Sequence, residues 1–259
     1  MESDYSSFQL TDKIAIVTGP SQGSGRAIAL GLAKAGANLV LAEHPAMHQD
    51  DLKQVKAAIE VLGRKAVTTL TDISKVDEVR AMVDLAVKTF GRLDILVNNA
   101  GWTCNGPALE TSEEDYDKTV DSTVKGTFFA CQAAARAMIL TGGGRSINIG
   151  SNFAVSAWRG RAVYCGAKAD VHELSRALSL EWAQQGVVVN VVAPCITETP
   201  SRKFIIERPG YKDFVKEKIA TGRWNQPEDL VGATLFLASP LAAQVCGHIL
   251  YVDGGWTIH

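Results

Sequence analysis

Short apolar runs recur along the chain and are separated by longer segments with the periodicity of amphipathic helices. Strands that are buried on both faces of a sheet consist of such continuous apolar runs. Helices of roughly 15 residues between the strands are typical of a parallel sheet with right-handed crossovers. The pattern therefore predicts an α/β fold, a doubly wound parallel sheet of about seven strands with helices on both faces. The runs lie at residues 14–18, 38–42, 66–70, 93–97, 146–149, 187–191 and 248–252.

No linker or repeat divides this pattern, so we expect a single domain over residues 1–259. One long stretch, from residue 195 to about residue 225, shows no regular pattern. A loop of that length is usually a lid over a site or a disordered segment. We expect a substrate lid there.

Composition and charge exclude several classes of protein. With 46% apolar residues the chain can build an ample core, and its net charge of −2 provides no basic surface for nucleic acid or an anionic membrane. The N-terminus lacks the pattern of a signal peptide, and no apolar run approaches roughly 18 residues. Five widely spaced cysteines indicate a reducing compartment, so we expect a cytoplasmic protein.

Metal binding is not predicted, because the five histidines form no ligand pair. His172 precedes Glu173 without the spacing of a metalloprotease motif. We expect His172 at a helix surface.

A glycine-rich turn follows the first apolar run and precedes a helix. Glycines let the backbone turn tightly and approach a pyrophosphate at a helix N-terminus. The spacing Gly-x-x-x-Gly-x-Gly differs from the common Gly-x-Gly-x-x-Gly, so a plain glycine-rich turn stays an alternative. The residues expected to contact a dinucleotide here are Gly19, Ser21, Gln22, Gly23, Ser24 and Gly25.

Glu43 ends the second run, where an acidic residue would bond the adenosine ribose of a dinucleotide. A carboxylate at that position repels a 2′-phosphate, and neither the glycine turn nor His44 supplies a fixed cation for one. The sequence therefore predicts NAD in preference to NADP. A solvated strand end is the alternative for Glu43.

Tyr164 and Lys168 stand four residues apart in a predicted helix and so share a face. A neighbouring cation favours a phenolate, which exchanges a proton with an alcohol or carbonyl oxygen. Ser151, at the end of a predicted strand, offers a hydroxyl for the same oxygen. Taken alone, such a pair is more often part of a solvated helix face, and only the rest of the chain favours a site.

Taken together, the motifs of nearly the whole chain resemble those of the short-chain dehydrogenase/reductase family. The resemblance implies a Rossmann-type domain that transfers a hydride between a nicotinamide cofactor and a secondary alcohol or carbonyl. The matching pieces, in chain order, are Thr18-Gly19-x-x-x-Gly23-x-Gly25, Asp72, Asn98-Asn99-Ala100-Gly101, Ser151, Tyr164-x-x-x-Lys168, Val189-Asn190, Pro194, Pro227-Glu-Asp and Asp253-Gly-Gly.

The resemblance also implies a role for each residue. Ser151 would orient the substrate oxygen, Tyr164 would be the acid/base, and Lys168 would hold the nicotinamide ribose. Asp72 and Ile73 would contact the adenine ring. Asn98 to Gly101 would form the cofactor-side wall. The implied cofactor contacts in the second half of the chain are Tyr164, Lys168, Pro194, Ile196 and Thr197, and those in the wall include Asn99, Ala100 and Gly101.

Three positions depart from the family pattern. Thr123 stands where the family has an Asn in a proton relay, so we expect a catalytic relay rearranged through water and slower turnover. Cys195 replaces the usual Gly after Pro194 and requires a negative φ. Ser24 replaces an apolar residue between two glycines.

Substrate choice is expected from the variable walls of the site. Arginines near the tyrosine and a basic lid favour an anionic or polyhydroxylated substrate. The segments from Gly222 to Leu230 and from Tyr251 to Trp256 resemble the branch that oxidises gluconate-type sugar acids, so a sugar, sugar acid or polyol is predicted. The candidate substrate residues are Trp102, Asn152, Phe153, Arg159 and Arg161.

Three other functions stay open. A 3-oxoacyl carrier-protein reductase shares the fold, but its carrier-binding arginines are Gly142 and Leu180 here. A general carbonyl or secondary-alcohol reductase would use an aromatic pocket. A sensor or scaffold that binds NAD without turnover would explain Thr123 and Cys195.

Members of the family usually pair their two long helices, here residues 112–139 and 162–184, so the resemblance implies a homotetramer.

Overall fold

The computed structural model describes residues 8–202 and 206–258. Its seven strands form one parallel sheet in the order β3-β2-β1-β4-β5-β6-β7. This confirms the predicted doubly wound fold, in which the strand order reverses between β1 and β4. The strands are β1 Ile14–Thr18, β2 Asn38–Glu43, β3 Ala66–Leu70, β4 Ile95–Asn98, β5 Gly144–Ile149, β6 Val187–Pro194 and β7 Ile249–Val252.

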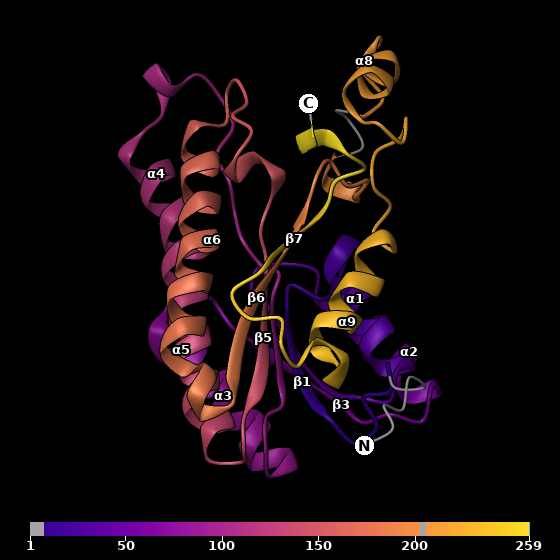
Figure 1. Cartoon of the computed structure of the whole chain (residues 1–259), viewed down its shortest axis with the longest axis vertical. Coiled ribbons are helices and arrows are strands. Elements are labelled where there is room, and N and C mark those ends of the chain that lie inside the picture. Colours follow the sequence, from indigo (N-terminus) through magenta and orange to yellow (C-terminus); the bar gives the residue numbers. More distant parts are fainter. Residues whose placement is uncertain (1–7, 203–205, 259) are drawn as a thin grey trace.

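Helices cover both faces of the sheet (Figure 1). Each face has its own apolar core, because residues of the buried strands alternate between the two sides. The helices packed on one face are α1 Gly23–Lys34, α2 Gln49–Val61 and α9 Asp229–Ala238. Those on the other are α3 Val76–Phe90, α5 Gly126–Ile139 and α6 Ala162–Trp182.

The expected helix over residues 112–139 is interrupted in its middle. α4 Glu113–Val120 begins at Ser112, whose hydroxyl accepts a hydrogen bond from the Asp115 amide at 3.1 Å. A π-helical turn, Asp121–Lys125, then joins α4 to α5. A side chain at Gly126 would approach the Ile73 carbonyl to 2.7 Å, so the helix passes close to the loop after β3. Such π-turns are frequent at functional sites, and this one contains Thr123.

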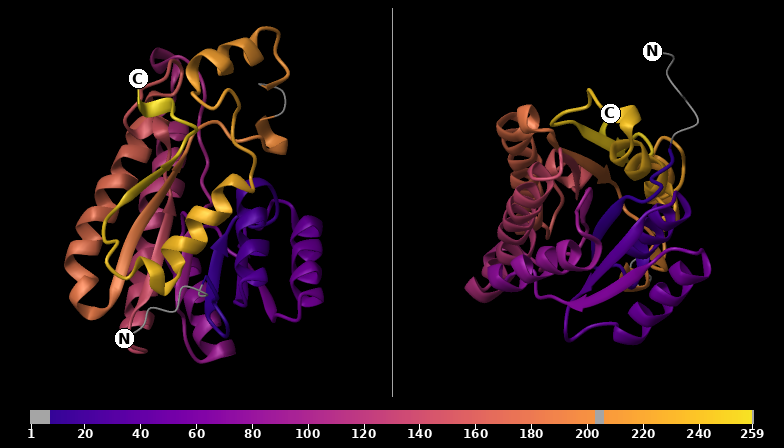
Figure 2. Two further views of the ribbon diagram at one scale, coloured as in Figure 1. Left: turned by 45° about the vertical axis from the view of Figure 1, so that its right-hand side comes forward. Right: turned by 90° about the horizontal axis from the view of Figure 1, so that it is seen from below.

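The prediction of an irregular segment over residues 195–225 was wrong in part. The segment contains a 3₁₀ turn, Pro200–Arg202, and helix α8 Tyr211–Lys218. Its two ends are joined, since the Asn225 amide donates to the Ile196 carbonyl at 2.9 Å and Thr197 pairs with Asn225. The segment with α8 stands beyond the carboxyl ends of β6 and β7, near the C-terminus (Figures 1 and 2). Part of the expected lid, residues 203–205, lies outside the described residues.

Smaller features complete the described chain. Short 3₁₀ helices lie at Ala108–Glu110, Asn152–Ala154, Ala183–Gln185, Pro240–Ala242 and Trp256–Ile258. All five cysteines are free thiols. Within residues 8–202 and 206–258 we find no helix with the length and apolar character needed to cross a membrane.

Candidate active site

The glycine turn after β1 is fixed against the loop after β4. The Asn99 amide side chain donates to the carbonyls of Thr18 and Gly19, each at 3.0 Å. The Thr18 hydroxyl accepts from the backbone amides of Asn99 and Ala100, also at 3.0 Å. Four hydrogen bonds thus hold the two loops side by side at the point where the strand order reverses.

The same turn has the shape of an anion cradle. Gly19 and Gly23 have φ of +63° and +52°, and a side chain at Gly25 would collide with the Gly19 carbonyl. The hydroxyl of Ser21 is buried and has no hydrogen-bond partner among the described residues. Helix α1 begins at once, with no side-chain cap and no acidic residue in its first turn. These residues fit the pyrophosphate of a dinucleotide, because free N–H groups and an unpartnered hydroxyl both favour an anion.

Two carboxylates lie beside this cradle, Glu43 at the end of β2 and Asp51 on α2. Glu43 is 6% exposed and accepts hydrogen bonds from the amides of Ser21 at 3.3 Å and His44 at 2.9 Å. Asp51 of α2 accepts a 2.6 Å hydrogen bond from the Gln22 side chain. Sequence reasoning missed Asp51, since nothing local links α2 to the glycine turn. Both carboxylates therefore lie beside residues of the glycine turn.

Asp72 and Ile73 follow β3 at the same edge. The Asp72 carboxylate accepts from the amide and hydroxyl of Ser74, at 3.0 and 2.7 Å. Burial opposes the charge on Asp72, but these hydrogen bonds and the positive charges of His44 and Lys75 together lower its pKa. Asp72 is thus a fixed anion that shapes the loop.

Ser151, Tyr164 and Lys168 meet at the carboxyl end of β5. Lys168 is 8% exposed, and its ammonium donates a 2.6 Å hydrogen bond to the Ile149 carbonyl. The Lys168 nitrogen lies 5.9 Å from the centre of the Tyr164 ring. Ser151 comes two residues after Ile149 and is 5% exposed; its hydroxyl accepts from the Phe153 amide at 3.1 Å. The Phe153 ring in turn lies edge-on to Tyr164, with centres 6.4 Å apart.

Burial lowers the pKa of Lys168, and Tyr164 partly opposes that shift. Positive charge on Arg202 lowers the pKa further. The Lys168 ammonium is therefore a desolvated charge, whose field acts strongly on neighbouring groups.

His172 is buried, at 4% exposed, so the prediction of a surface position was wrong. Its ring lies on the face of α6 turned toward the sheet, with its centre 6.2 Å from that of Tyr251 on β7. The His172 Nε2 atom accepts a 3.4 Å hydrogen bond from the Ser151 amide. Burial, followed by the positive charges of Lys168 and Arg176, lowers the pKa of His172 to about 4. A neutral imidazole therefore supports the backbone of Ser151.

Thr123 lies near the site, but in the described part of the chain no direct hydrogen bond joins it to Lys168. Its side chain is buried, and its hydroxyl donates to the Trp102 carbonyl at 3.3 Å. Lys168 instead donates to Ile149. The direct bonds of Thr123 fix the loop after Gly101, and a relay through water stays a prediction.

The Asn98 side chain is buried and hydrogen-bonded in the core, and its place in a cofactor-side wall stays a prediction. Its side-chain amide donates to Asn148 on β5 at 2.9 Å and to the Cys131 sulfur at 3.3 Å. Asn148 donates to the Ser175 hydroxyl at 2.9 Å. Burial raises the pKa of the Cys131 thiol to about 12, so it stays protonated. This buried polar network joins β4, β5 and α6 beneath the site.

The loop after β6 closes the site on its far side. Pro194 ends the strand, Cys195 is buried with a pKa raised to about 12 by burial, and the Thr197 hydroxyl donates to the Cys195 carbonyl at 3.2 Å. Thr199 was not among the predicted contacts. Its methyl group would lie 2.7 Å from a side chain placed at Gly23, so this loop reaches across to the glycine turn.

Aromatic rings wall the space beyond Tyr164. Phe153 stacks on Trp158 with ring centres 5.7 Å apart, and Trp256 lies edge-on to both. Phe214 of α8 packs on Trp158 at 5.4 Å. Trp256 and Phe214 were missed from the sequence because the C-terminus and α8 reach this wall only in the folded chain.

A small cavity of about 60 Å³ adjoins this wall. Of the five predicted substrate residues, Phe153 and Arg161 line it. Arg159 is exposed, and Trp102 lies under Lys118, whose ammonium is 4.4 Å from the ring centre. Asn152 is buried, and its side-chain nitrogen has no partner among the described residues. The residues lining the cavity are Phe153, Trp158, Arg161, Ile196, Arg202, Ile206 and Tyr211.

Comparison with known proteins agrees with this geometry. A family model described as enoyl-(acyl carrier protein) reductase matches residues 19–257. The 2-dehydro-3-deoxy-D-gluconate 5-dehydrogenase of Escherichia coli (strain K12) is 37% identical over 252 residues, which cover 97% of this chain and 98% of that protein. The chain belongs to the short-chain dehydrogenase/reductase family. The predicted resemblance is confirmed, and the chain is a nicotinamide-dependent oxidoreductase of CH–OH groups.

Two further relatives share the whole length of the chain. D-threitol dehydrogenase of Mycolicibacterium smegmatis is 36% identical over 253 residues, covering 97% of this chain and 95% of that protein. The structure of a gluconate 5-dehydrogenase from Burkholderia cenocepacia J2315, in complex with NADP and tartrate, superposes with a TM-score of 0.92. It is 32% identical and covers 97% of this chain and 98% of its own. The agreement therefore extends beyond the nucleotide-binding half.

Proposed function

We propose that this enzyme oxidises a secondary alcohol of a sugar acid or polyol, with NAD as the preferred cofactor. The observation that carries the proposal is the meeting of Tyr164, Lys168 and Ser151 at the end of β5, beside a cavity lined by Arg161. The named activities of the relatives, on gluconate-type acids and on threitol, support this substrate class.

The residues divide the chemistry among them. A bound nicotinamide dinucleotide supplies the hydride acceptor. The Tyr164 phenolate takes the proton of the substrate hydroxyl, and the Lys168 ammonium stabilises the phenolate. The Ser151 hydroxyl orients the substrate oxygen, supported through its backbone by His172. Gly19, Ser21 and the start of α1 hold the pyrophosphate.

The preference for NAD rests on two carboxylates. Glu43 and Asp51 both bond residues of the glycine turn, so each lies near the adenosine ribose site. A 2′-phosphate placed there would meet two negative charges, while the ribose hydroxyls of NAD would find acceptors. Crystal structures of relatives hold NADP, so the fold itself does not exclude a 2′-phosphate, and the proposed preference for NAD rests on Glu43 and Asp51.

Initial rates test the proposal directly. NADH absorbance is followed with gluconate, other aldonates, polyols, aldoses and simple secondary alcohols, each with NAD and with NADP. The proposal predicts the highest kcat/KM for an aldonate or polyol with NAD. The highest value for an unfunctionalised alcohol would contradict it and would favour the second candidate, a general secondary-alcohol enzyme, which the aromatic wall of Phe153, Trp158 and Trp256 would suit.

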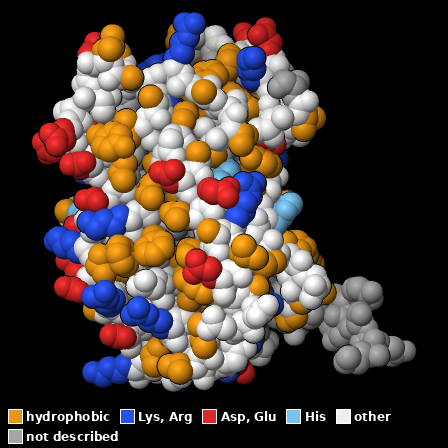
Figure 3. Space-filling view, turned by 60° about the vertical axis from the view of Figure 1, so that its left-hand side comes forward, with side chains coloured by type: hydrophobic (Ala, Val, Ile, Leu, Met, Phe, Trp, Pro, Cys, Tyr) orange, Lys and Arg blue, Asp and Glu red, His pale blue; other side chains and the backbone are white. Residues whose placement is uncertain are grey.

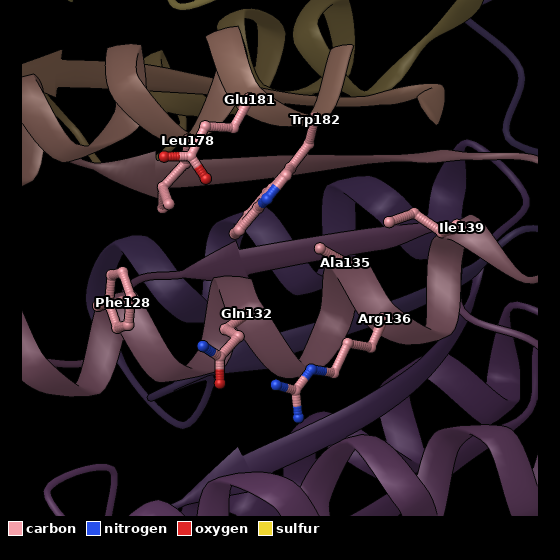
Figure 4. A pocket seen from close by; sticks show the side chains of 8 residues that line it. All are labelled: Phe128, Gln132, Ala135, Arg136, Ile139, Leu178, Glu181 and Trp182. Atoms are coloured by element: carbon pink, nitrogen blue, oxygen red, sulfur yellow. The ribbon is translucent and has the colours of Figure 1, made fainter. Parts of the chain in front are cut away.

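The enzyme is further proposed to assemble as a homotetramer through α5 and α6. A groove of about 320 Å³ runs between these helices, and Trp182 of α6 points toward α5 beside Ala135 (Figure 4). On the side of the molecule where α4, α5 and α6 lie, hydrophobic side chains are interspersed with charges (Figure 3). Sedimentation should give the mass of four chains, and a mass near that of one chain would contradict the proposal. The groove is lined by Phe128, Gln132, Ala135, Arg136, Ile139, Leu178, Glu181 and Trp182.

A further inference from the structure

Two arginines from distant parts of the chain face the small cavity beyond Phe153. Arg161 directly precedes α6, three residues before Tyr164, and its carbonyl accepts from the Cys165 amide at 2.8 Å. Arg202 belongs to the 3₁₀ turn after β6. Both side chains line the cavity and are half-buried.

The two guanidinium groups repel one another. Burial lowers the pKa of Arg161, and the charge on Arg202 lowers it further. Neither arginine forms an ion pair with a carboxylate within residues 8–202 and 206–258. Like charges that share a partly desolvated site are unfavourable unless an anion joins them.

The remaining walls strengthen the attraction for an anion. Apart from the arginines and the Tyr211 hydroxyl, the lining consists of apolar side chains, namely Phe153, Trp158, Ile196 and Ile206. Charge interactions are stronger where few polar groups or waters screen them. Glu198, a nearby acid on the same loop, already accepts hydrogen bonds from Trp224 and Gln226, each at 2.8 Å.

We propose that Arg161 and Arg202 together bind a carboxylate group of the substrate. This inference rests on the proposed function and names the acidic group that its substrate carries. Planar guanidinium groups bind carboxylates through paired hydrogen bonds, and Tyr211 adds a hydroxyl. The Phe153 ring lines this cavity and also contacts the Tyr164 ring, so the cavity and Tyr164 both lie next to one aromatic side chain.

A matched pair of ligands isolates the carboxylate. D-gluconate and D-gluconamide differ only in their terminal group, which is charged in the first and neutral in the second. Calorimetric titration of the Tyr164→Phe enzyme–NAD complex, in which oxidation is slowed, should give at least about tenfold tighter binding of gluconate, equivalent to about 1.4 kcal/mol. Arg202→Gln and Arg161→Gln should each weaken gluconate binding about 10- to 100-fold and leave gluconamide within about twofold.

Arg80→Gln is the matched control, because Arg80 is an exposed arginine of α3 and does not line the cavity. It should change neither affinity. Arg202→Lys keeps a charge without the planar fork and should fall between wild type and Arg202→Gln. Unchanged NAD affinity shows that each variant is folded.

The inference would be overturned by equal binding of gluconate and gluconamide, by equal effects of Arg80→Gln and Arg202→Gln, or by failure of both gluconate and tartrate to bind. Tighter binding of glucitol 6-phosphate than of gluconate would also overturn it, in favour of a phosphate. Gluconate that binds through both arginines but forms no NADH would leave this site intact and refute the proposed function instead.

Discussion

The Lys168 ammonium donates a hydrogen bond to the Ile149 carbonyl at 2.6 Å, and this bond ties the part of α6 that carries Tyr164 to the carboxyl end of β5. It places the charge of Lys168 between the strand that leads to Ser151 and the helical turn that carries Tyr164. The bond therefore fixes Lys168 and Tyr164, which lie on α6, relative to Ser151, which follows β5.

The rate should depend on the protonation of Lys168. Burial lowers the pKa of Lys168 from its ordinary 10.5, so the ammonium loses its proton at a lower pH than an exposed lysine would. Since the charged form stabilises the phenolate, kcat/KM should fall on the alkaline side below pH 10.5. Lys168→Arg, which does not titrate in this range, should lower the rate and move that fall to higher pH. An alkaline limb at the same pH in both enzymes would contradict the assignment.

Cofactor choice should respond to Glu43. Glu43→Gln removes the negative charge and keeps one acceptor oxygen, for the amide of either Ser21 or His44. The Kd for NADP should therefore fall about tenfold, whereas the Kd for NAD should change less than about threefold. Asp51→Asn should act in the same direction, and Glu60→Gln, at the far end of α2, should have no effect. Fluorescence titration of both cofactors measures this, and an unchanged ratio of the two Kd values would count against the adenosine site described above.

The glycine turn should not tolerate a methyl group at Gly25. The new side chain would collide with the Gly19 carbonyl, so the backbone that forms the cradle must shift. Gly25→Ala should lower the free energy of unfolding by about 1–3 kcal/mol and weaken NAD binding at least about 100-fold. Gly232→Ala is the control, because nothing lies within 4 Å of its added methyl on α9, and it should raise stability by about 0.5–1 kcal/mol. Normal NAD binding by Gly25→Ala would refute the cradle.

The sequence predicts the features that one short segment encodes. It does not predict those that depend on contacts between distant segments of the chain. The sheet, the glycine turn and the Tyr164–Lys168 pair follow from local patterns, which one short segment can reveal. The burial of His172 does not, because the residue faces Tyr251, which lies far along the chain on β7. The buried position of Asn98 likewise depends on a distant segment, because its side chain donates a hydrogen bond to Asn148 on β5.

Residues that reach the site from another element were missed for the same reason. Asp51 meets Gln22, and Thr199 meets Gly23, only after the chain folds. The basic character of the segment after β6 was visible in the sequence, yet only the structure shows that Arg202 shares a cavity with Arg161.

Stability at low pH should depend on His172. Its pKa is lowered from 6.5 to about 4 by burial, so between these values the unfolded chain binds a proton that the folded chain does not. The neutral imidazole therefore contributes on the order of 3 kcal/mol above pH 6.5, and this contribution is lost as the pH falls toward 4. His172→Gln keeps an acceptor for the Ser151 amide but cannot titrate, so its urea midpoint should fall less between the two pH values. An equal fall in both proteins would show that other groups govern acid unfolding.

The central claim is that the Tyr164 hydroxyl exchanges the substrate proton, and Tyr164→Phe removes that hydroxyl alone. The decisive measurement is NADH formation by wild type and Tyr164→Phe on the best substrate, beside the Kd of each for NAD. We predict that the variant loses about 10²- to 10⁴-fold in kcat and binds NAD within about threefold of wild type. Equal rates in the two proteins, or two equally inert proteins that both bind NAD, would contradict the account.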